Sequence, residues 1–204
     1  MIERFDCAQN TPEWVECRRG IPTTSEFSTV MAEGRKKGEP SVTRRKYLYR
    51  LLGERITGEV VESYTNAHMD RGHAMEPDAR NLYAMLFDAD PEPCGFLRNH
   101  GAGYSPDGLI GNAGTFEAKS MFPAILIDLL LTKEVPSEHY KQCQGGLWIA
   151  EREFCDYVGY WPRMVPFMVR VHRDEPMIAR IASAVAQFND ELSQLEARIR
   201  AMAA

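Results

Sequence analysis

Residues 105–119, which read SPDGLIGNAGTFEAK, constrain the fold of this chain more than any other stretch. Two short apolar segments flank a Gly-Asn-Ala-Gly junction, a turn of the kind that joins neighbouring strands. Alternate residues of a strand share a face, so Glu117 and Lys119 point the same way and Ala118 points into the core. Pairing of the two segments brings Asp107 alongside that face. The sequence therefore predicts a β-hairpin that presents two carboxylates and one ammonium group together.

The charged side chains of this hairpin suit a metal-dependent hydrolase. Two carboxylates provide the hard oxygen ligands that Mg²⁺ prefers. An ammonium group beside them can orient an attacking water or, with a depressed pKa, help to deprotonate it. The spacing P-D-x9-E-x-K also matches the PD-(D/E)xK nuclease signature. A solvated hairpin with a stray charge pair explains the same motif, so the rest of the chain has to decide.

Length and composition are those of an ordinary globular protein. The 204 residues suffice for one domain with a sizeable core, and 44% of them are hydrophobic while 26% are charged. No run of about 18 apolar residues occurs, and the N-terminus lacks an apolar signal core. The five cysteines are scattered without a C-x-x-C pair, which favours reduced thiols over structural zinc. We therefore expect a cytoplasmic protein without membrane contact.

Charge is distributed unevenly along the chain, whose net charge is −5. Between Arg18 and Arg55 there are ten Lys or Arg and four Glu, whereas the remainder carries fourteen basic and twenty-five acidic residues. A basic front on an acidic body can hold a polyanion on one surface. For Arg44, Arg45 and Lys46, a solvated helix face is an equally good explanation.

Hydrophobic periodicity and capping signals predict helices interspersed with strands. Thr11 and Pro12 begin the first helix, Ser41 opens the third, and Ser137 caps a later one. The predicted helices cover residues 12–19, 24–32, 43–56, 66–87, 123–131, 137–149 and 175–202. Besides the hairpin, the predicted strands cover residues 95–99, 154–160 and 166–171.

Two of these helices carry a feature that can be explained in two ways. In the helix of residues 66–87, Glu76 lies on the stripe of apolar and small residues, where a carboxylate is costly unless it is paired or bound. It either forms an ion pair with Arg80 one turn later or belongs to the charged site. The last helix carries an unbroken heptad seam from Ile178 to Met202. That seam packs either on this chain's own core, which we favour, or on another subunit.

Four sequence blocks in order carry a family resemblance. They are Trp14-x3-Arg18-x-Gly20 with Thr24-Ser25-Glu26, then Gly72-x3-Glu76-x2-Ala79-Arg80, then Ser105-Pro106-Asp107-Gly108-Leu109 with Glu117-Ala118-Lys119, and finally Tyr140-x-Gln142-x-Gln144. With these blocks the chain resembles the lambda-exonuclease family of viral-type alkaline exonucleases, within the PD-(D/E)xK nucleases. Ser120-Met121 departs from the Cys-Pro that often follows the lysine in relatives, but neither position is charged.

The resemblance implies an α/β fold in which helices flank a central mixed β-sheet with a restriction-endonuclease-like core. Residues 1–204 would form one nuclease domain, with the N-terminal helices of residues 11–57 as its DNA-end-binding part. The implied activity is magnesium-dependent, with Mn²⁺ as a substitute ion, and degrades one strand of linear double-stranded DNA from the 5′ end to mononucleotides. The implied partners are the DNA end, two further copies in a homotrimeric ring, and a single-strand annealing recombinase.

We expect the site residues to have distinct roles. The ligands of Mg²⁺ are Asp107, Glu117 and the carbonyl of Ala118. Glu76 completes the coordination shell of the ion directly or through water, and one alternative has a second metal ion that shares Asp107. Lys119 acts on the attacking water, and Gln142 supports the site or contacts a phosphate. By the resemblance, the residues near the terminal 5′-phosphate are Arg18, Ser25, Arg35 and Ser105.

Two other functions fit the same pattern. The core also builds restriction-type or structure-specific endonucleases, which would cut a covalently closed circle that an exonuclease leaves intact. A non-catalytic DNA-binding scaffold is the second alternative. The presence of Asp107, Glu117, Lys119 and Glu76 together argues against it.

Overall fold

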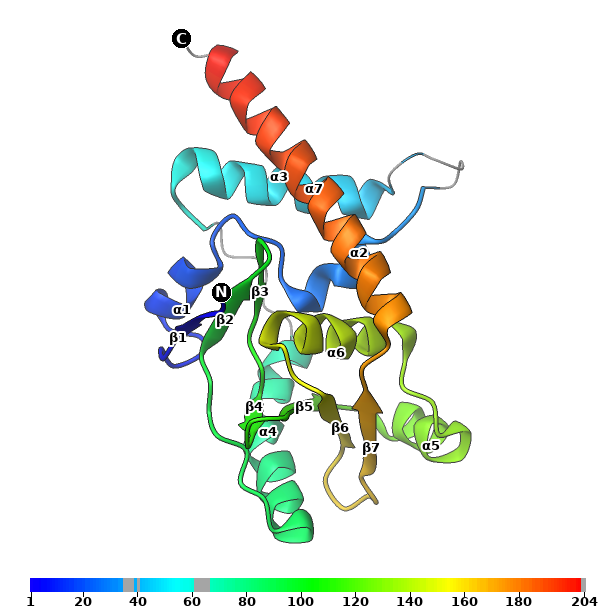
Figure 1. The fold of residues 1–204 in the computed structure, drawn as a ribbon. Helices are drawn as coiled ribbons and strands as arrows, with labels where there is room; N and C mark the ends of the chain where they lie inside the picture. Colours follow the sequence, from blue (N-terminus) through cyan, green and yellow to red (C-terminus); the bar gives the residue numbers. More distant parts are fainter. Residues whose placement is uncertain (35–38, 40, 61–66, 203–204) are drawn as a thin grey trace.

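The computed structural model describes residues 1–34, 39, 41–60 and 67–202, and Arg35 therefore lies outside the described residues. Helices pack around two β-sheets (Figure 1). The helices are α1 Pro12–Arg18, the 3-10 turn η1 Thr24–Glu26, α2 Phe27–Val30, α3 Val42–Thr57, α4 Ala67–Phe87, α5 Pro123–Thr132, α6 Ser137–Ala150 and α7 Glu175–Met202. The strands are β1 Glu3–Phe5, β2 Phe96–Asn99, β3 Ala102–Tyr104, β4 Gly108–Ile110, β5 Gly114–Ser120, β6 Phe154–Tyr160 and β7 Phe167–His172.

The larger sheet has the order β4-β5-β6-β7 and is mixed. The predicted hairpin forms its β4–β5 edge, where the strands pair antiparallel with Gly108 opposite Phe116. Strand β5 then pairs parallel with β6, and Glu117 lies opposite Tyr157. Parallel neighbours need a crossover connection, which α5 and α6 provide. The mixed sheet flanked by helices is thus the predicted fold class, and it is confirmed.

The smaller sheet is antiparallel, with the order β1-β2-β3, and only β2 was predicted. Strands β1 and β3 have three residues each, too short to show alternation. Gly103 in the middle of β3 lowers its strand propensity further. A side chain there would collide with the ring of Phe96, since a Cβ atom would lie 2.0 Å from it. Close packing against Phe96 thus requires a glycine at position 103, and this glycine is one reason why β3 was not predicted.

Most predicted helix ends are confirmed by their capping contacts. The Trp14 amide donates to the Thr11 hydroxyl, the Arg44 amide donates to the Ser41 hydroxyl, and α3 ends at Gly58 with φ of 75°. Two details were wrong. Ser137 is the first residue of α6 and not its cap, because Pro136 takes the cap position. The second predicted helix is split into η1 and α2.

Helix α7 packs on its own chain along most of its length. Its seam residues Ile181, Val185 and Phe188 are fully buried in the core that includes α3, and the rings of Phe188 and Tyr47 lie 5.5 Å apart. Near the C-terminus Met202 is 68% exposed, where α7 extends beyond α3 (Figure 1). The favoured explanation of the heptad seam is therefore confirmed for the buried part.

Several basic residues of the N-terminal region are paired within the chain. Arg44 contacts Glu191 at 2.7 Å, and Arg55 contacts Glu196 at 3.5 Å, both on α7. These ion pairs reduce the charge that the N-terminal helices offer to a polyanion, and Arg44 is not merely a solvated side chain. Among the described helices, none is long and apolar enough to cross a membrane.

Candidate active site

The hairpin places Asp107 directly beside β5. Asp107 precedes β4, and its Oδ2 accepts a hydrogen bond of 2.7 Å from the amide of Ala118. In a strand, the amide and carbonyl of one residue point to the same edge. Ala118 therefore directs its carbonyl toward the edge where Asp107 lies. The hydrogen bond thus confirms that Asp107 lies alongside β5, as the hairpin predicted.

Glu117 is the most enclosed charged group of the site, with 1% of its surface exposed. Its Oε2 accepts hydrogen bonds from Lys119 Nζ at 3.0 Å and from Gln142 Nε2 at 2.9 Å. Its Oε1 is buried and makes no hydrogen bond of ordinary length and angle within the described part of the chain, although the Tyr104 hydroxyl lies near enough to lower the pKa of the carboxyl. Helix α6 thus brings Gln142 onto the hairpin, as predicted, and one carboxylate oxygen is left for another group.

Burial and neighbouring charges shift the pKa values of this pair. Burial raises the pKa of Glu117 to about 7, against the opposing effect of the Lys119 ammonium. Burial alone would lower the pKa of Lys119, but the charges of Glu117 and Asp107 outweigh it and raise that pKa well above its ordinary value. Lys119 is thus a cation at neutral pH. The expectation of a base with a depressed pKa is not supported by the protein's own charges.

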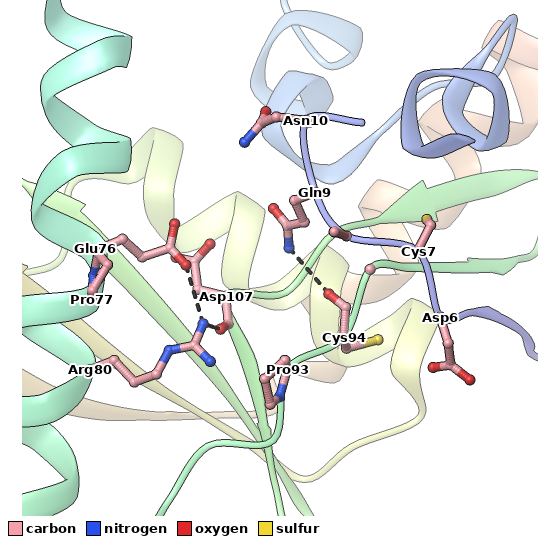
Figure 2. A pocket seen from close by; sticks show the side chains of 12 residues that line it. Asp6, Cys7, Gln9, Asn10, Glu76, Pro77, Arg80, Pro93, Cys94 and Asp107 are labelled. Atoms are coloured by element: carbon pink, nitrogen blue, oxygen red, sulfur yellow. Dashed lines mark hydrogen bonds and ion pairs between the residues drawn. The ribbon is translucent and has the colours of Figure 1, made fainter. Parts of the chain in front are cut away.

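Glu76 and Arg80 form the predicted ion pair on α4, with 3.2 Å between Arg80 Nη2 and Glu76 Oε1. The same nitrogen also donates to the backbone carbonyl of Asp107. Burial first, and the charge of Asp107 second, raise the pKa of Glu76. In Figure 2 the carboxylates of Glu76 and Asp107 lie next to each other. The predicted ion pair is therefore present beside Asp107, and a role of Glu76 in a metal site stays a prediction.

The oxygen atoms of this region fit a hard divalent cation. They comprise the carboxylates of Asp107 and Glu117 and the carbonyl of Ala118, with Glu76 adjacent. Over the described residues, no group of three or more His, Cys, Asp or Glu side chains could hold a metal ion. A backbone carbonyl and water would therefore have to contribute. The unpaired oxygen of Glu117 is the observation that favours such an ion.

Two of the predicted phosphate-binding residues meet beside the carboxylates. Arg18 Nη1 donates to Ser105 Oγ at 3.0 Å, and Trp14 Nε1 donates to the same oxygen at 2.9 Å. The Arg18 guanidinium also lies over the Trp14 ring, 4.0 Å from its centroid. Burial lowers the pKa of Arg18. Because Ser105 lies two positions before Asp107, this cluster adjoins the candidate metal site.

The other two predicted phosphate residues are less closely tied to that cluster. Ser25 lies in η1, and its hydroxyl is 3.3 Å from that of Thr23. A β-bridge between Thr23 and Gly103 holds η1 against β3, which leads directly to Ser105. Ser25 thus lies near β3, the strand that precedes Ser105. Arg35 falls outside the described residues.

A cavity of about 520 Å³ opens beside Asp107 (Figure 2). Its walls come from α4, from the loop before β2 and from the N-terminal segment Asp6–Asn10. This N-terminal segment carries no motif, and no role was predicted for it. The only feature of the sequence related to its position is Gly95, because a Cβ atom there would lie 2.0 Å from the Cys7 carbonyl. A glycine that permits such close approach is visible only once the fold is known.

Solved structures of exonucleases resemble this fold. The crystal structure of the alkaline exonuclease LHK-Exo from Laribacter hongkongensis has 31% sequence identity and a TM-score of 0.85, over 95% of this chain and 98% of that chain. A structure of LHK-Exo in complex with dAMP matches equally well. A phage related exonuclease from Haemophilus somnus 129PT shares the fold, with 14% identity and a TM-score of 0.68 over 88% of this chain and 96% of that one. No curated protein sequence matches the chain.

The sequence itself matches a family over most of its length. Residues 13–153 match the YqaJ-like viral recombinase domain, a range that includes the four predicted blocks from Trp14 through Gln144. Together with the likeness to LHK-Exo, this match confirms the predicted resemblance to viral-type alkaline exonucleases. The chain belongs to the YqaJ-like viral recombinase domain family.

Proposed function

We propose that the protein is a Mg²⁺-dependent exonuclease that removes mononucleotides from the 5′ end of one strand of linear double-stranded DNA, leaving a 3′ overhang. The observation that carries this proposal is the buried Glu117 carboxylate, which has one unpaired oxygen beside Asp107 and the Lys119 ammonium. The likeness to LHK-Exo, an alkaline exonuclease also solved in complex with dAMP, supports the substrate class.

Asp107, Glu117 and the Ala118 carbonyl would hold the Mg²⁺, with Glu76 next to them. When bound, the ion would polarise the scissile phosphate and neutralise the charge that builds on it. Lys119 and Gln142 hold the Glu117 carboxylate in place through Oε2. Lys119 also presents an ammonium group that can orient the attacking water and stabilise negative charge. Mn²⁺ should replace Mg²⁺ because both prefer oxygen ligands.

The cluster of Arg18, Trp14 and Ser105 provides the proposed contact with the terminal 5′-phosphate. The Ser105 oxygen accepts from both Arg18 and Trp14, so its own proton is free to donate to a phosphate oxygen. A guanidinium donates charge-assisted hydrogen bonds to a terminal phosphate, and a terminal hydroxyl has no negative charge to accept them. Ser25 and Arg35 complete this subsite in our proposal, which makes residues 11–57 the end-binding part of the domain.

The test uses three DNA substrates. A linear duplex labelled at the 5′ ends should release labelled mononucleotide at once, while the 3′-labelled duplex should release label only after the strand has been degraded. A covalently closed circle should stay intact. Cleavage of the circle would favour the alternative, an endonuclease of restriction or structure-specific type. Early release of the 3′ label would reverse the proposed polarity.

A second measurement tests end recognition. Initial rates on 5′-phosphorylated and 5′-hydroxyl ends should differ by about 5- to 150-fold, the range that one to three kcal/mol gives. Arg18→Ala and Arg35→Ala should each reduce that ratio. If a variant slows both ends equally, its arginine attracts only the duplex backbone.

The proposed assembly is a homotrimeric ring around the DNA that works with a single-strand annealing recombinase. It rests on the resemblance to lambda-type exonucleases, and membership in a viral recombinase domain family supports a recombination role. Light scattering at micromolar concentration should give three times the mass of one chain. A monomer would contradict the ring.

A further inference from the structure

The loop that carries Asp107 is held by a side chain from the N-terminal segment. Gln9 Nε2 donates to the carbonyl of Pro106 at 2.8 Å and to that of Cys94 at 3.2 Å. Proline has no amide hydrogen, so the backbone at this position can be tied only through its carbonyl. The bond spans 97 positions of sequence and ends directly before the candidate metal ligand.

The segment that bears Gln9 is fixed against its neighbours. The loop before β2 approaches it so closely that a Cβ atom at Gly95 would lie 2.0 Å from the Cys7 carbonyl and 2.7 Å from the Phe5 carbonyl. Immediately before this segment, β1 pairs with β2. In Figure 2, Gln9 extends from the N-terminal segment toward the Cys94 carbonyl, across the cavity from α4. Gln9 thus projects from a support that cannot shift freely.

A second side chain holds the same loop from the opposite wall. Arg80 on α4 donates to the Asp107 carbonyl and also contacts Glu76. The carbonyls of two successive residues, Pro106 and Asp107, are therefore bound by side chains from different elements. Such double support limits the positions that the Asp107 carboxylate can take, and metal ligands depend on support of this kind.

We propose that Gln9 is a positioning residue for Asp107, which makes the N-terminal segment a working part of the metal site. This inference rests on the proposed function and adds a residue that lies outside residues 13–153, the range matched by the family. Gln9 donates to the carbonyls of Cys94 and Pro106 and not to the Asp107 carboxylate itself. It sets the orientation of a ligand, so its removal should weaken metal binding more than it weakens the fold.

The experiment measures Mg²⁺ binding by calorimetry, together with the melting temperature of the metal-free protein and the Mg²⁺ dependence of turnover. The test variant is Gln9→Leu, which keeps the size of the side chain and removes both hydrogen bonds. Gln9→Lys restores a donor. The matched control is Asn189→Leu, because the Asn189 amide also donates to a loop carbonyl, that of Gly101 at 3.0 Å.

We expect Gln9→Leu to raise the Kd for Mg²⁺ about tenfold, the lower end of the effect of residues that support metal ligands. Turnover at saturating Mg²⁺ should recover most of its wild-type value, and Gln9→Lys should regain most of the affinity. Asn189→Leu should leave the affinity unchanged. If Gln9→Leu only lowers the melting temperature, as the control does, the residue is structural and the inference is wrong.

The two proposals can fail separately. Wild-type protein that binds Mg²⁺ but cuts no DNA would overturn the proposed function, while calorimetry on the Gln9 variants would still decide the positioning role. Wild-type protein that binds no Mg²⁺ would overturn both.

Discussion

Two buried carboxylates on neighbouring strands, Glu117 on β5 and Asp156 on β6, differ in their hydrogen-bond partners. Asp156 has partners for both oxygens. Arg170 donates to each of them at 2.8 Å, and Tyr83 donates to Oδ2 at 2.5 Å. Glu117 has donors only at Oε2, and its Oε1 is unpaired within the described residues. One carboxylate is satisfied by its own chain and the other is not.

We infer that the difference separates a structural carboxylate from a functional one. A buried polar atom without a partner costs about 1–3 kcal/mol, so it calls for an explanation, and a bound ion is one that suits a carboxylate oxygen. Arg170 additionally stacks on Phe154, with 3.7 Å from its guanidinium carbon to the ring centroid. Perturbing the Asp156 cluster should therefore lower stability. Perturbing Glu117 should remove activity and leave the fold intact.

The largest expected effect is loss of turnover in Glu117→Gln. We expect a decrease of more than about a thousandfold, because the change removes a charged ligand from a hard cation. The circular dichroism spectrum and the melting temperature should match wild type or exceed it, since a buried charge is removed. Asp107→Asn should behave similarly in single-turnover cleavage. Residual turnover above about a thousandth of wild type would count heavily against this site.

The second effect is a pH dependence of stability in metal-free protein. The folded pKa of Glu117, about 7, lies above its ordinary value of 4.5. The unfolded chain therefore loses this proton first, and the contribution of Glu117 to stability decreases as the pH rises from about 4.5 to 7, by about 3 kcal/mol. His139 contributes in the opposite sense, because burial lowers its pKa to about 4. Urea unfolding of wild type and Glu117→Gln across this range gives the Glu117 contribution as the difference between the two slopes, and equal slopes would mean that Glu117 contributes none.

The third effect concerns Lys119→Ala, which should lower turnover about a hundredfold. Mg²⁺ affinity should survive, because Gln142 still holds the Glu117 carboxylate and the variant no longer places an ammonium group beside the cation. Calorimetry and single-turnover rates separate the two quantities. Loss of Mg²⁺ affinity together with activity would mean that Lys119 has a structural role, as Arg170 has beside Asp156.

The smallest effect is expected at the satisfied carboxylate. Tyr83→Phe removes one charge-assisted hydrogen bond and should lower the free energy of unfolding by about 1.5 kcal/mol. Turnover per folded molecule should not change. Tyr49→Phe, at a residue that is 55% exposed, is the control and should be neutral. If Tyr83→Phe instead altered Mg²⁺ dependence, the contrast between the two carboxylates would not hold.

Local pattern accounts for what the sequence could predict. Strand alternation placed Glu117 and Lys119 on one face, and the turn before them brought Asp107 alongside. Heptad spacing identified the buried face of α7. These predictions succeeded because each depends on residues close together in the chain.

The missed features depend on long-range contacts. Gln9 meets Pro106 only in the folded chain, and Arg44 finds Glu191 across 147 positions. Strand β3 was not predicted because Gly103 lowers its strand propensity, and the reason for this glycine is the Phe96 ring packed against it. No spacing rule reveals such pairs, because the positions of both partners are set by elements elsewhere in the fold.

The parallel pairing of β5 with β6 also sets the order in which the site can form. Strand β5 meets β4 through a tight turn, a contact of low sequence separation that closes quickly. Its pairing with β6 joins Gly114 to Phe154 and must wait for α5 and α6. Gln142 arrives with that same crossover. A growing chain on the ribosome thus carries the hairpin motif well before it can bury Glu117, so a partly synthesised copy lacks the enclosed carboxylate that cutting DNA would require.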